Sequence, residues 1–160
     1  MNIEATLEDL EAQGYFATQT SLQTNDRTGV CGLVRVNFAD SAPTKYLARP
    51  ILGANFIGGF TTNQPSSNWL AINLNQVSHI DNLDSQTLLE TPATLLQVIT
   101  EHFIEITLEL GLAQKRLSGK VMSQLGNCVN FLREDRVSCW IPESNISYVA
   151  VEKLSNRLKL

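Results

Sequence analysis

The sequence predicts an α+β fold: an antiparallel sheet of about five to seven strands, one long buried helix and a short N-terminal helix. Short runs of alternating apolar and polar residues predict the strands, and a helical apolar pattern with capping residues predicts each helix. A chain of 160 residues has the length of one domain, so we assign residues 1–160 to a single α+β domain.

The N-terminal region predicts a short helix followed by a β-hairpin. Asn2 can cap a helix over residues 3–13, and Gly14 is placed to end it. Residues 15–22 are rich in aromatic and β-branched side chains, and residues 30–38 alternate well. We therefore expect two strands after the helix.

The middle of the chain predicts further short strands. Residues 55–61, 69–74 and 77–80 carry the apolar and β-branched side chains of strands. Residues 46–51 and 113–125 fit no single pattern, and for the latter both helix and irregular structure stay open.

Residues 91–110 predict the long helix. Thr91 can cap it, Pro92 suits its first position, and Gly111 can end it. The apolar residues wrap more than half of the helical circumference, which predicts burial on most sides. They are Leu95, Leu96, Val98, Ile99, Phe103, Ile104, Ile106, Leu108 and Leu110.

The C-terminal region predicts a second hairpin over residues 128–141. A two-residue turn at Glu134 and Asp135 would place two sets of side chains on opposite faces. One set is Cys128, Leu132, Val137, Cys139 and Ile141, and the other is Val129, Phe131 and Trp140. Residues 146–151 then predict a short strand or a helix entry, and residues 152–160 a terminal helix.

A short pattern occurs twice. Ile72 and the run from Val77 to Ile80 line up, 69 residues on, with Ile141 and the run from Ile146 to Val149. A duplicated strand–turn–strand unit and a chance likeness of two strand exits both explain this.

Charge is unevenly distributed along the chain. The net charge is −4, and no lysine or arginine occurs between Arg49 and Lys115. This acidic balance gives no bulk attraction to nucleic acid or to an anionic membrane, so nucleic acid is not an expected partner. The basic C-terminal third keeps polyanion binding open as a weaker hypothesis.

Three glutamates of the predicted long helix repeat every fourth residue. Glu101, Glu105 and Glu109 would form one stripe on it. A solvated edge, ion pairs with Lys115, Arg116 or Lys120, and a docking stripe for a basic partner are the open interpretations. We retain the stripe as the candidate partner-binding site.

No catalytic, cofactor-binding or metal-binding motif is present in the sequence, so we predict no such site and no cofactor. His79 is followed by Asp81 near a strand end and is the candidate acid or base. With Trp69 and Trp140, it defines a candidate ligand pocket. His102 lacks the second histidine that a zinc helix needs.

The expected compartment is the cytoplasm. The cysteines are three, Cys31, Cys128 and Cys139, which suits free thiols better than a disulfide framework. No secretory or transmembrane pattern is seen, so no membrane contact is expected.

These observations favour a non-enzymatic binding, adaptor or regulatory protein that acts through protein contacts. Its partner would be another protein or a second copy, with a homodimer as one form. The alternative is a small-ligand-binding domain or minor enzyme with a pocket between sheet and helix near His79.

Overall fold

The predicted α+β fold is wrong, because the residues that the structure describes form mostly antiparallel sheet with one α-helix. A computed structural model describes residues 33–40, 42–61, 68–83, 88–111 and 115–151. Within these ranges eleven strands form one sheet, accompanied by one α-helix and two short 3-10 helices. The helices predicted at residues 3–13 and 152–160 and the strand at 15–22 lie outside the described residues.

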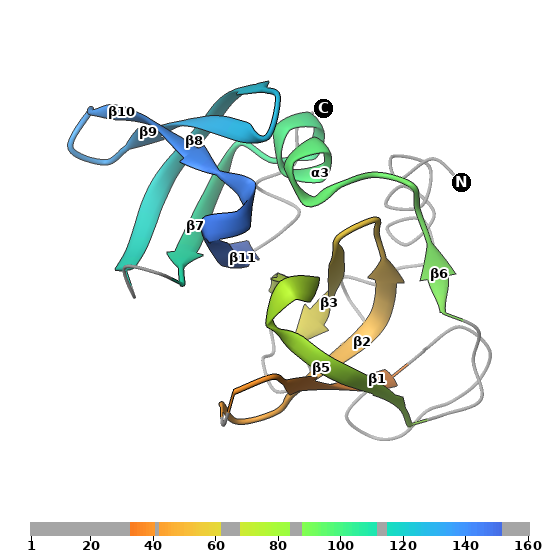
Figure 1. Ribbon diagram of the computed structural model, residues 1–160. Coiled ribbons are helices and arrows are strands. Elements are labelled where there is room, and N and C mark those ends of the chain that lie inside the picture. The colour runs from red at the N-terminus through yellow and green to blue at the C-terminus, as the bar shows by residue number, and fades with distance from the viewer. Residues whose placement is uncertain (1–32, 41, 62–67, 84–87, 112–114, 152–160) are drawn as a thin grey trace.

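The elements follow one another in a regular order (Figure 1). The first group is β1 (Leu33–Phe38), β2 (Lys45–Leu52), β3 (Phe56–Thr61), β4 (Trp69–Asn73), the 3-10 helix η2 (Leu74–Gln76) and β5 (Val77–Asn82). Next come β6 (Leu89–Glu90) and the helix α3 (Leu95–His102). The second group is β7 (Glu105–Leu110), β8 (Lys115–Leu125), β9 (Cys128–Arg133), β10 (Ser138–Pro142), η3 (Glu143–Asn145) and β11 (Ile146–Val151).

The predicted helix over residues 91–110 is divided between α3 and the strand β7. The helix begins later than predicted, at the cap Thr94. The Thr94 hydroxyl accepts a hydrogen bond from the Gln97 backbone N–H, and the Gln97 side-chain oxygen accepts one from the Thr94 backbone N–H. From residue 105 onward, apolar and polar residues alternate, with Ile106 and Leu108 buried and Glu105, Thr107 and Glu109 less buried. Because β7 pairs with β8 on one side and β11 on the other, these pairings decide the strand.

Two regions without a clear pattern are also strands. Residues 46–51 lie in β2 and residues 115–125 form β8. β8 is exposed over most of its length, so burial gives it little sequence signal. The hydrogen-bonded pairing with β7 on one side and β9 on the other therefore holds β8 as a strand.

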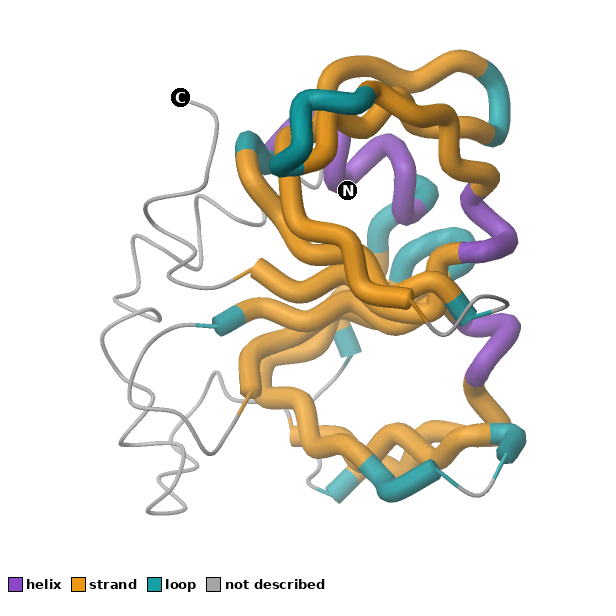
Figure 2. Tube along the Cα trace, turned by 90° about the vertical axis from the view of Figure 1, so that its left-hand side faces the viewer, coloured by secondary structure: helices purple, strands orange, loops and turns teal. Residues whose placement is uncertain are grey.

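The chain consists of two five-stranded units with the same strand order. The first unit is ordered β5-β1-β2-β3-β4, and the second is ordered β11-β7-β8-β9-β10. In both units a 3-10 helix links the fourth and fifth strands. Figure 1 shows the two units as separate groups of strands, and Figure 2 shows them one above the other.

The strand registers of the two units coincide. Adding 72 to each number takes the pair Leu33–Ala48 of β1 and β2 onto the pair Glu105–Lys120 of β7 and β8. The same offset takes β1 onto β7 and β3 onto β9 along their full lengths. An offset of 69 takes β4, η2 and β5 onto β10, η3 and β11, again end to end. The loop between the third and fourth strands accounts for the difference of three residues.

The irregularities of the sheet are repeated as well. The ladder of β1 with β5 passes over Ser78, and the ladder of β7 with β11 passes over Ser147. The second strand of each unit has a bulge where it pairs with the third, between Ala48 and Ile51 and between Val121 and Ser123. Since bulges are specific structural features, their coincidence supports a duplication of the whole unit.

Two long-range hydrogen bonds occur in both units. The Leu74 backbone N–H donates to the Asn55 oxygen at 2.9 Å, and Glu143 donates to Asn127 at 2.8 Å. Likewise, Ala39 donates to Gln76 and Gly111 donates to Asn145, both at 2.9 Å. The short sequence echo therefore belongs to a duplication that extends over all five strands.

The two units share one sheet because β4 pairs antiparallel with β11. At this junction Ala71 faces Val149 and Ile72 faces Tyr148. There are two apolar cores. One lies beneath α3 and contains buried residues of both units, among them Phe60 of β3 and Leu108 of β7, whereas the buried residues of the other all come from the first unit. Trp69 packs on Phe103 in the former, with ring centroids 5.1 Å apart.

The C-terminal hairpin is present, but its predicted faces are wrong. β9 and β10 pair with Val129 opposite Ile141 and Phe131 opposite Cys139, and these four side chains share the core face. The Arg133 N–H closes the loop onto the Val137 oxygen rather than forming a two-residue turn. This moves the register by one residue, which turns the side chains of one strand to the other face.

Candidate functional site

The two ends of the sheet are the candidate functional site. β10 and β5 are its terminal strands, and in the part of the chain that the structure describes no strand pairs with their outer sides. They lie far apart in Figure 1. An open edge presents backbone N–H and C=O groups that another strand can pair with.

β10 has only part of the usual protection of an edge strand, since it is short and ends at Pro142. It contains no charged residue, and Trp140 on it is 51% exposed. Other large apolar side chains are exposed at Val137, which directly precedes β10, and at Met122 and Leu125 on β8, two strands away. Charged residues normally protect a free edge, so an uncharged edge with an exposed tryptophan suits contact with another chain.

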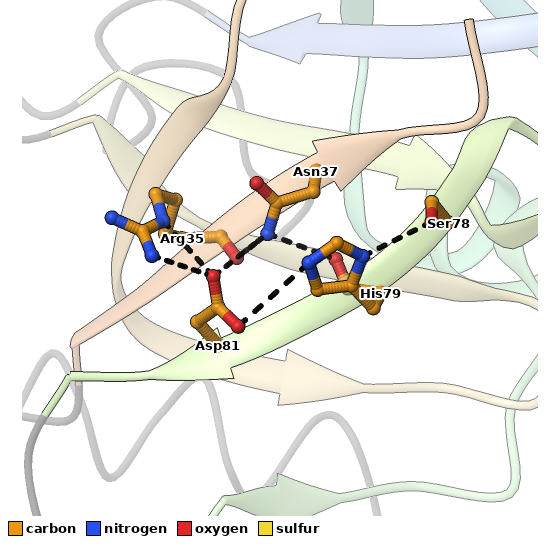
Figure 3. A network of polar contacts seen from close by, with 5 residues as sticks. All are labelled: Arg35, Asn37, Ser78, His79 and Asp81. Carbon is orange, nitrogen blue, oxygen red and sulfur yellow. Dashed lines mark hydrogen bonds and ion pairs between the residues drawn. The ribbon is translucent and has the colours of Figure 1, made fainter.

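β5 has a polar outer face that is organised by Asp81 (Figure 3). The Arg35 guanidinium donates to Asp81 Oδ2 through Nε at 3.0 Å and Nη2 at 2.8 Å, and Asn37 Nδ2 donates to the same oxygen at 2.9 Å. Arg35 and Asn37 come from β1, whose register places them opposite Asp81 and His79. The network therefore ties the open strand β5 to its only neighbour among the described strands.

The network shifts two pKa values. The hydrogen bonds from Arg35, and then from Asn37, lower the pKa of Asp81. The hydrogen bond to Asp81 raises the pKa of Arg35. Both shifts favour the charged forms, so this pair stays ionised at neutral pH.

Ser78, His79 and Asp81 have the residue types of a proton relay but not its geometry. Ser78 Oγ lies 3.0 Å from His79 Nδ1, and His79 Nε2 lies 3.9 Å from Asp81 Oδ1, beyond hydrogen-bond distance. The His79 side chain is 62% exposed, and the Asp81 carboxylate is already engaged by Arg35. This arrangement orders the strand surface but does not enclose a substrate.

Two hollows adjoin on the outer face of the second unit. The larger one, about 560 Å³, lies over β7, β8 and the tip of the β9–β10 hairpin. The smaller one, about 350 Å³, reaches toward β2. Thr107, Ser118 and Ala150 line both hollows. Both lie on the open surface of the sheet, and His79 lines neither.

The three residues of the predicted ligand pocket are not brought together. Trp69 is buried at the junction of the units, Trp140 is exposed on β10, and His79 lies on β5 at the other end of the sheet. Between α3 and the sheet, the side chains of Leu95, Leu96, Val98 and Ile99 are fully buried in a packed core.

The predicted glutamate stripe is not continuous, because its residues lie on two elements. Glu101 belongs to α3, whereas Glu105 and Glu109 lie on β7. Glu109 pairs with Arg116 across the β7–β8 ladder at 3.6 Å, and Glu105 stands opposite Lys120 in the same ladder. The ion-pair interpretation therefore holds for Glu109, on a strand rather than on a helix.

Sequence reasoning missed the edge of β10 as a site. The available signal was the 69-residue echo, because extending it makes β10 the counterpart of the central strand β4. The absence of charge from Ser138 to Pro142 was a second signal.

No group of three His, Cys, Asp or Glu side chains able to hold a metal ion is found among the described residues. None of the helices in those same ranges is long and apolar enough to span a membrane. Comparison with known proteins shows no relationship: no family model, no curated protein and no solved structure matches the chain.

Proposed function

We propose that this chain is a non-enzymatic binding protein that acts through protein–protein contacts at the open edges of its sheet. The observation that carries the proposal is Trp140, half exposed on an uncharged terminal strand. Tryptophan is enriched among the residues that dominate interface energies. An exposed edge can also supply a row of backbone hydrogen bonds to an added strand.

The surroundings of Trp140 fit a contact surface. Leu125 and Met122 on β8 and Val137 next to β10 are also exposed. Among the residues that the structure describes, four of the six large exposed apolar side chains therefore lie in or beside β8 and β10. Such gathering on one end of a molecule is typical of an interaction surface. A reducing compartment such as the cytoplasm fits the free thiols of Cys128 and Cys139.

Photo-crosslinking from position 140 tests the proposal. We would replace Trp140 with benzoylphenylalanine, which keeps an aromatic ring there, in the organism that encodes the chain. The matched control carries the same residue in place of Ile104, which is 42% exposed and lies between α3 and β7, outside this contact surface. We expect a covalent adduct with a protein chain from position 140 and much less from position 104. No adduct from position 140 would contradict the proposal.

The alternative, a small-ligand site or minor enzyme near His79, depends on the Ser78–His79 contact of 3.0 Å. It requires His79 to bind a ligand at the open surface of β5. A His79→Ala variant that binds a library of small metabolites as the native protein does would argue against it. The Ser78→Ala variant controls for loss of the local hydrogen bond.

A further inference from the structure

The junction inside the chain is itself a contact between two equivalent units. It joins the fourth strand of the first unit, β4, to the fifth strand of the second unit, β11, through four residue pairs. The two units share strand order, register and bulges. Each unit therefore has one side that can form this contact as a fourth strand and another that can form it as a fifth strand.

Within the chain, one fourth strand and one fifth strand do not form this contact. The fourth strand of the second unit is β10, and the fifth strand of the first unit is β5. These are the two terminal strands of the sheet, and nothing among the described residues pairs with their outer edges. The two unpaired edges, of β10 and β5, are therefore equivalent to the edges of β4 and β11 that pair at the junction.

Equivalent positions are buried at the junction and uncovered at the open edges. Ala71 and Val149 face each other at the junction and are 0% exposed. Their counterparts at the offset of 69 are Trp140, which is 51% exposed, and Ile80, which is half-buried. Trp140 is thus exposed on β10, whereas its equivalent Ala71 on β4 is buried by the pairing of the two units.

We propose that copies of this chain associate head to tail, with the outer edge of β10 in one copy pairing antiparallel with the outer edge of β5 in the next. Transferring the junction register places Ile141 opposite His79, Trp140 opposite Ile80, Cys139 opposite Asp81, and Ser138 opposite Asn82. Trp140 then covers the core of the next copy's first unit. This inference rests on the proposed function and names its partner as a second copy.

The charge of β5 disfavours one of the two like-with-like pairings, that of β5 with a second β5. β5 carries Asp81 and β10 carries no charge. Two β5 strands in one ladder would bring two Asp81 carboxylates together, whereas β10 against β5 brings only one. Charged residues on an edge strand commonly disfavour unwanted strand pairings in this way.

The contact is heterologous, because the two surfaces belong to different strands. An open assembly of any length keeps one free β10 and one free β5, at its two ends. Repetition of such a contact yields a ring if the rotation between copies closes and an open filament if it does not. A symmetric homodimer, in which one surface meets itself, is not the expected assembly.

Paired cysteines test the register directly. Ser138 and Asn82 are exposed, have no part in the polar network and would face each other between copies. Directly opposed residues in an antiparallel pair have Cβ atoms about 4.5–5.5 Å apart, close to what a disulfide needs. We expect mild oxidation of an equimolar mixture of Ser138→Cys and Asn82→Cys proteins to give covalent dimers that reductant dissolves.

The single variants and the native protein are the controls. Each variant oxidised alone should give no more dimer than the native chain, whose own cysteines set the background. Dimers from Ser138→Cys alone would show that β10 meets itself, and would overturn the head-to-tail arrangement. A mixture that stays at the native background would overturn it as well.

Sedimentation velocity of the full chain at tens of micromolar supplies an independent test. We expect the native protein to sediment as an oligomer, the Trp140→Glu variant as a monomer, and the Ile104→Glu variant as the native protein. Ile104 is 42% exposed and lies between α3 and β7, outside β10 and the exposed apolar residues around it. A monomeric native protein would overturn self-assembly. If the native protein is monomeric but position 140 crosslinks to a different protein, the proposed function survives and only self-assembly fails. If position 140 crosslinks to no protein, both proposals fail.

Discussion

The two units of this chain share a backbone plan but almost none of their residues. Strand order, register and both irregularities coincide. Yet no position has the same residue when β1, β2 and β3 are set against their counterparts at the offset of 72. Identity is kept at Asn55 and Asn127, at Ile72 and Ile141, and at Ser78 and Ser147. Many different side chains can therefore support the same pairing.

What the units keep is the alternation of apolar residues. Val34 and Val36 in β1 correspond to Ile106 and Leu108 in β7, and all four are buried. Because side chains alternate faces along a strand, apolar residues two apart suffice to hold one face inward. Identity at each position can change while this pattern is kept.

Large and small residues are exchanged between the units. Leu47 on β2 corresponds to Gly119 on β8, and Gly59 on β3 corresponds to Phe131 on β9. A Cβ on Gly59 would meet Leu47 Cβ at 2.9 Å. Each unit thus places its large side chain on a different strand, which is how a core of similar volume tolerates substitution.

The strongest contrast between the units should come from Trp69 and its counterpart Ser138. Trp69 is buried at the junction, so Trp69→Ala should lower the free energy of unfolding by about 3–5 kcal/mol. Ser138→Ala on the exposed edge should change it by less than about 0.5 kcal/mol. Urea unfolding of both variants measures the difference. Equal losses would mean that the two strands are not in different environments.

The next largest effect is expected for Gly119→Ala. A Cβ there would run into the backbone carbonyl of Leu132, which cannot move away without breaking the β8–β9 ladder. We expect a loss of about 1–3 kcal/mol in the free energy of unfolding. Ser123→Ala, exposed on the same strand, is the control and should be near neutral. A stable Gly119→Ala protein would show that the ladder adapts.

A smaller effect should separate the two equivalent asparagines. Asn55 Oδ1 accepts the Leu95 backbone N–H at 2.8 Å and so binds the first turn of α3 from the first unit. Asn55→Ala should cost about 1 kcal/mol of unfolding free energy. Asn127 is exposed, and Asn127→Ala should cost less. Thermal unfolding followed by circular dichroism compares them, and the reverse order would contradict this role for Asn55.

The smallest effect concerns Asp81, whose counterpart in the second unit is Ala150. Arg35 and Asn37 lower the pKa of Asp81 in the folded protein. Its contribution to stability is therefore present above the ordinary carboxyl pKa, about 3.9, and is lost as pH falls through the lower folded value. We expect the urea midpoints of native and Asp81→Asn proteins to differ near pH 7 and to converge in acid. A difference that persists at low pH would rule out this linkage.

Sequence reasoning located many strands but misjudged the architecture. The strand over residues 33–38 and the C-terminal hairpin were predictable because buried and less buried residues alternate along them. The strands over residues 56–61 and 69–73 are buried on both faces and were predictable from their apolar and aromatic residues. The long helix was not, because the apolar residues after Phe103 satisfy helical and alternating patterns together. Only the neighbouring strands β8 and β11 decide between these patterns.

The candidate site was less predictable than the fold. His79, Trp69 and Trp140 were chosen as residue types that bind ligands, yet they lie at separate places in the sheet. An open edge is made of backbone groups, which every residue possesses, so no residue type marks it. Its position depends on which strands have neighbours.

The sequence by itself determined the alternation of strands such as residues 33–38 and the presence of a repeated pattern at an offset of 69. These are local properties, set by the order of apolar and polar side chains along the chain. The tertiary structure alone decided that residues 105–110 form a strand, that the repeat covers five strands, and that β10 and β5 end the sheet. The reason is that a strand is completed by hydrogen bonds to residues far away in the chain, and its own sequence does not name them.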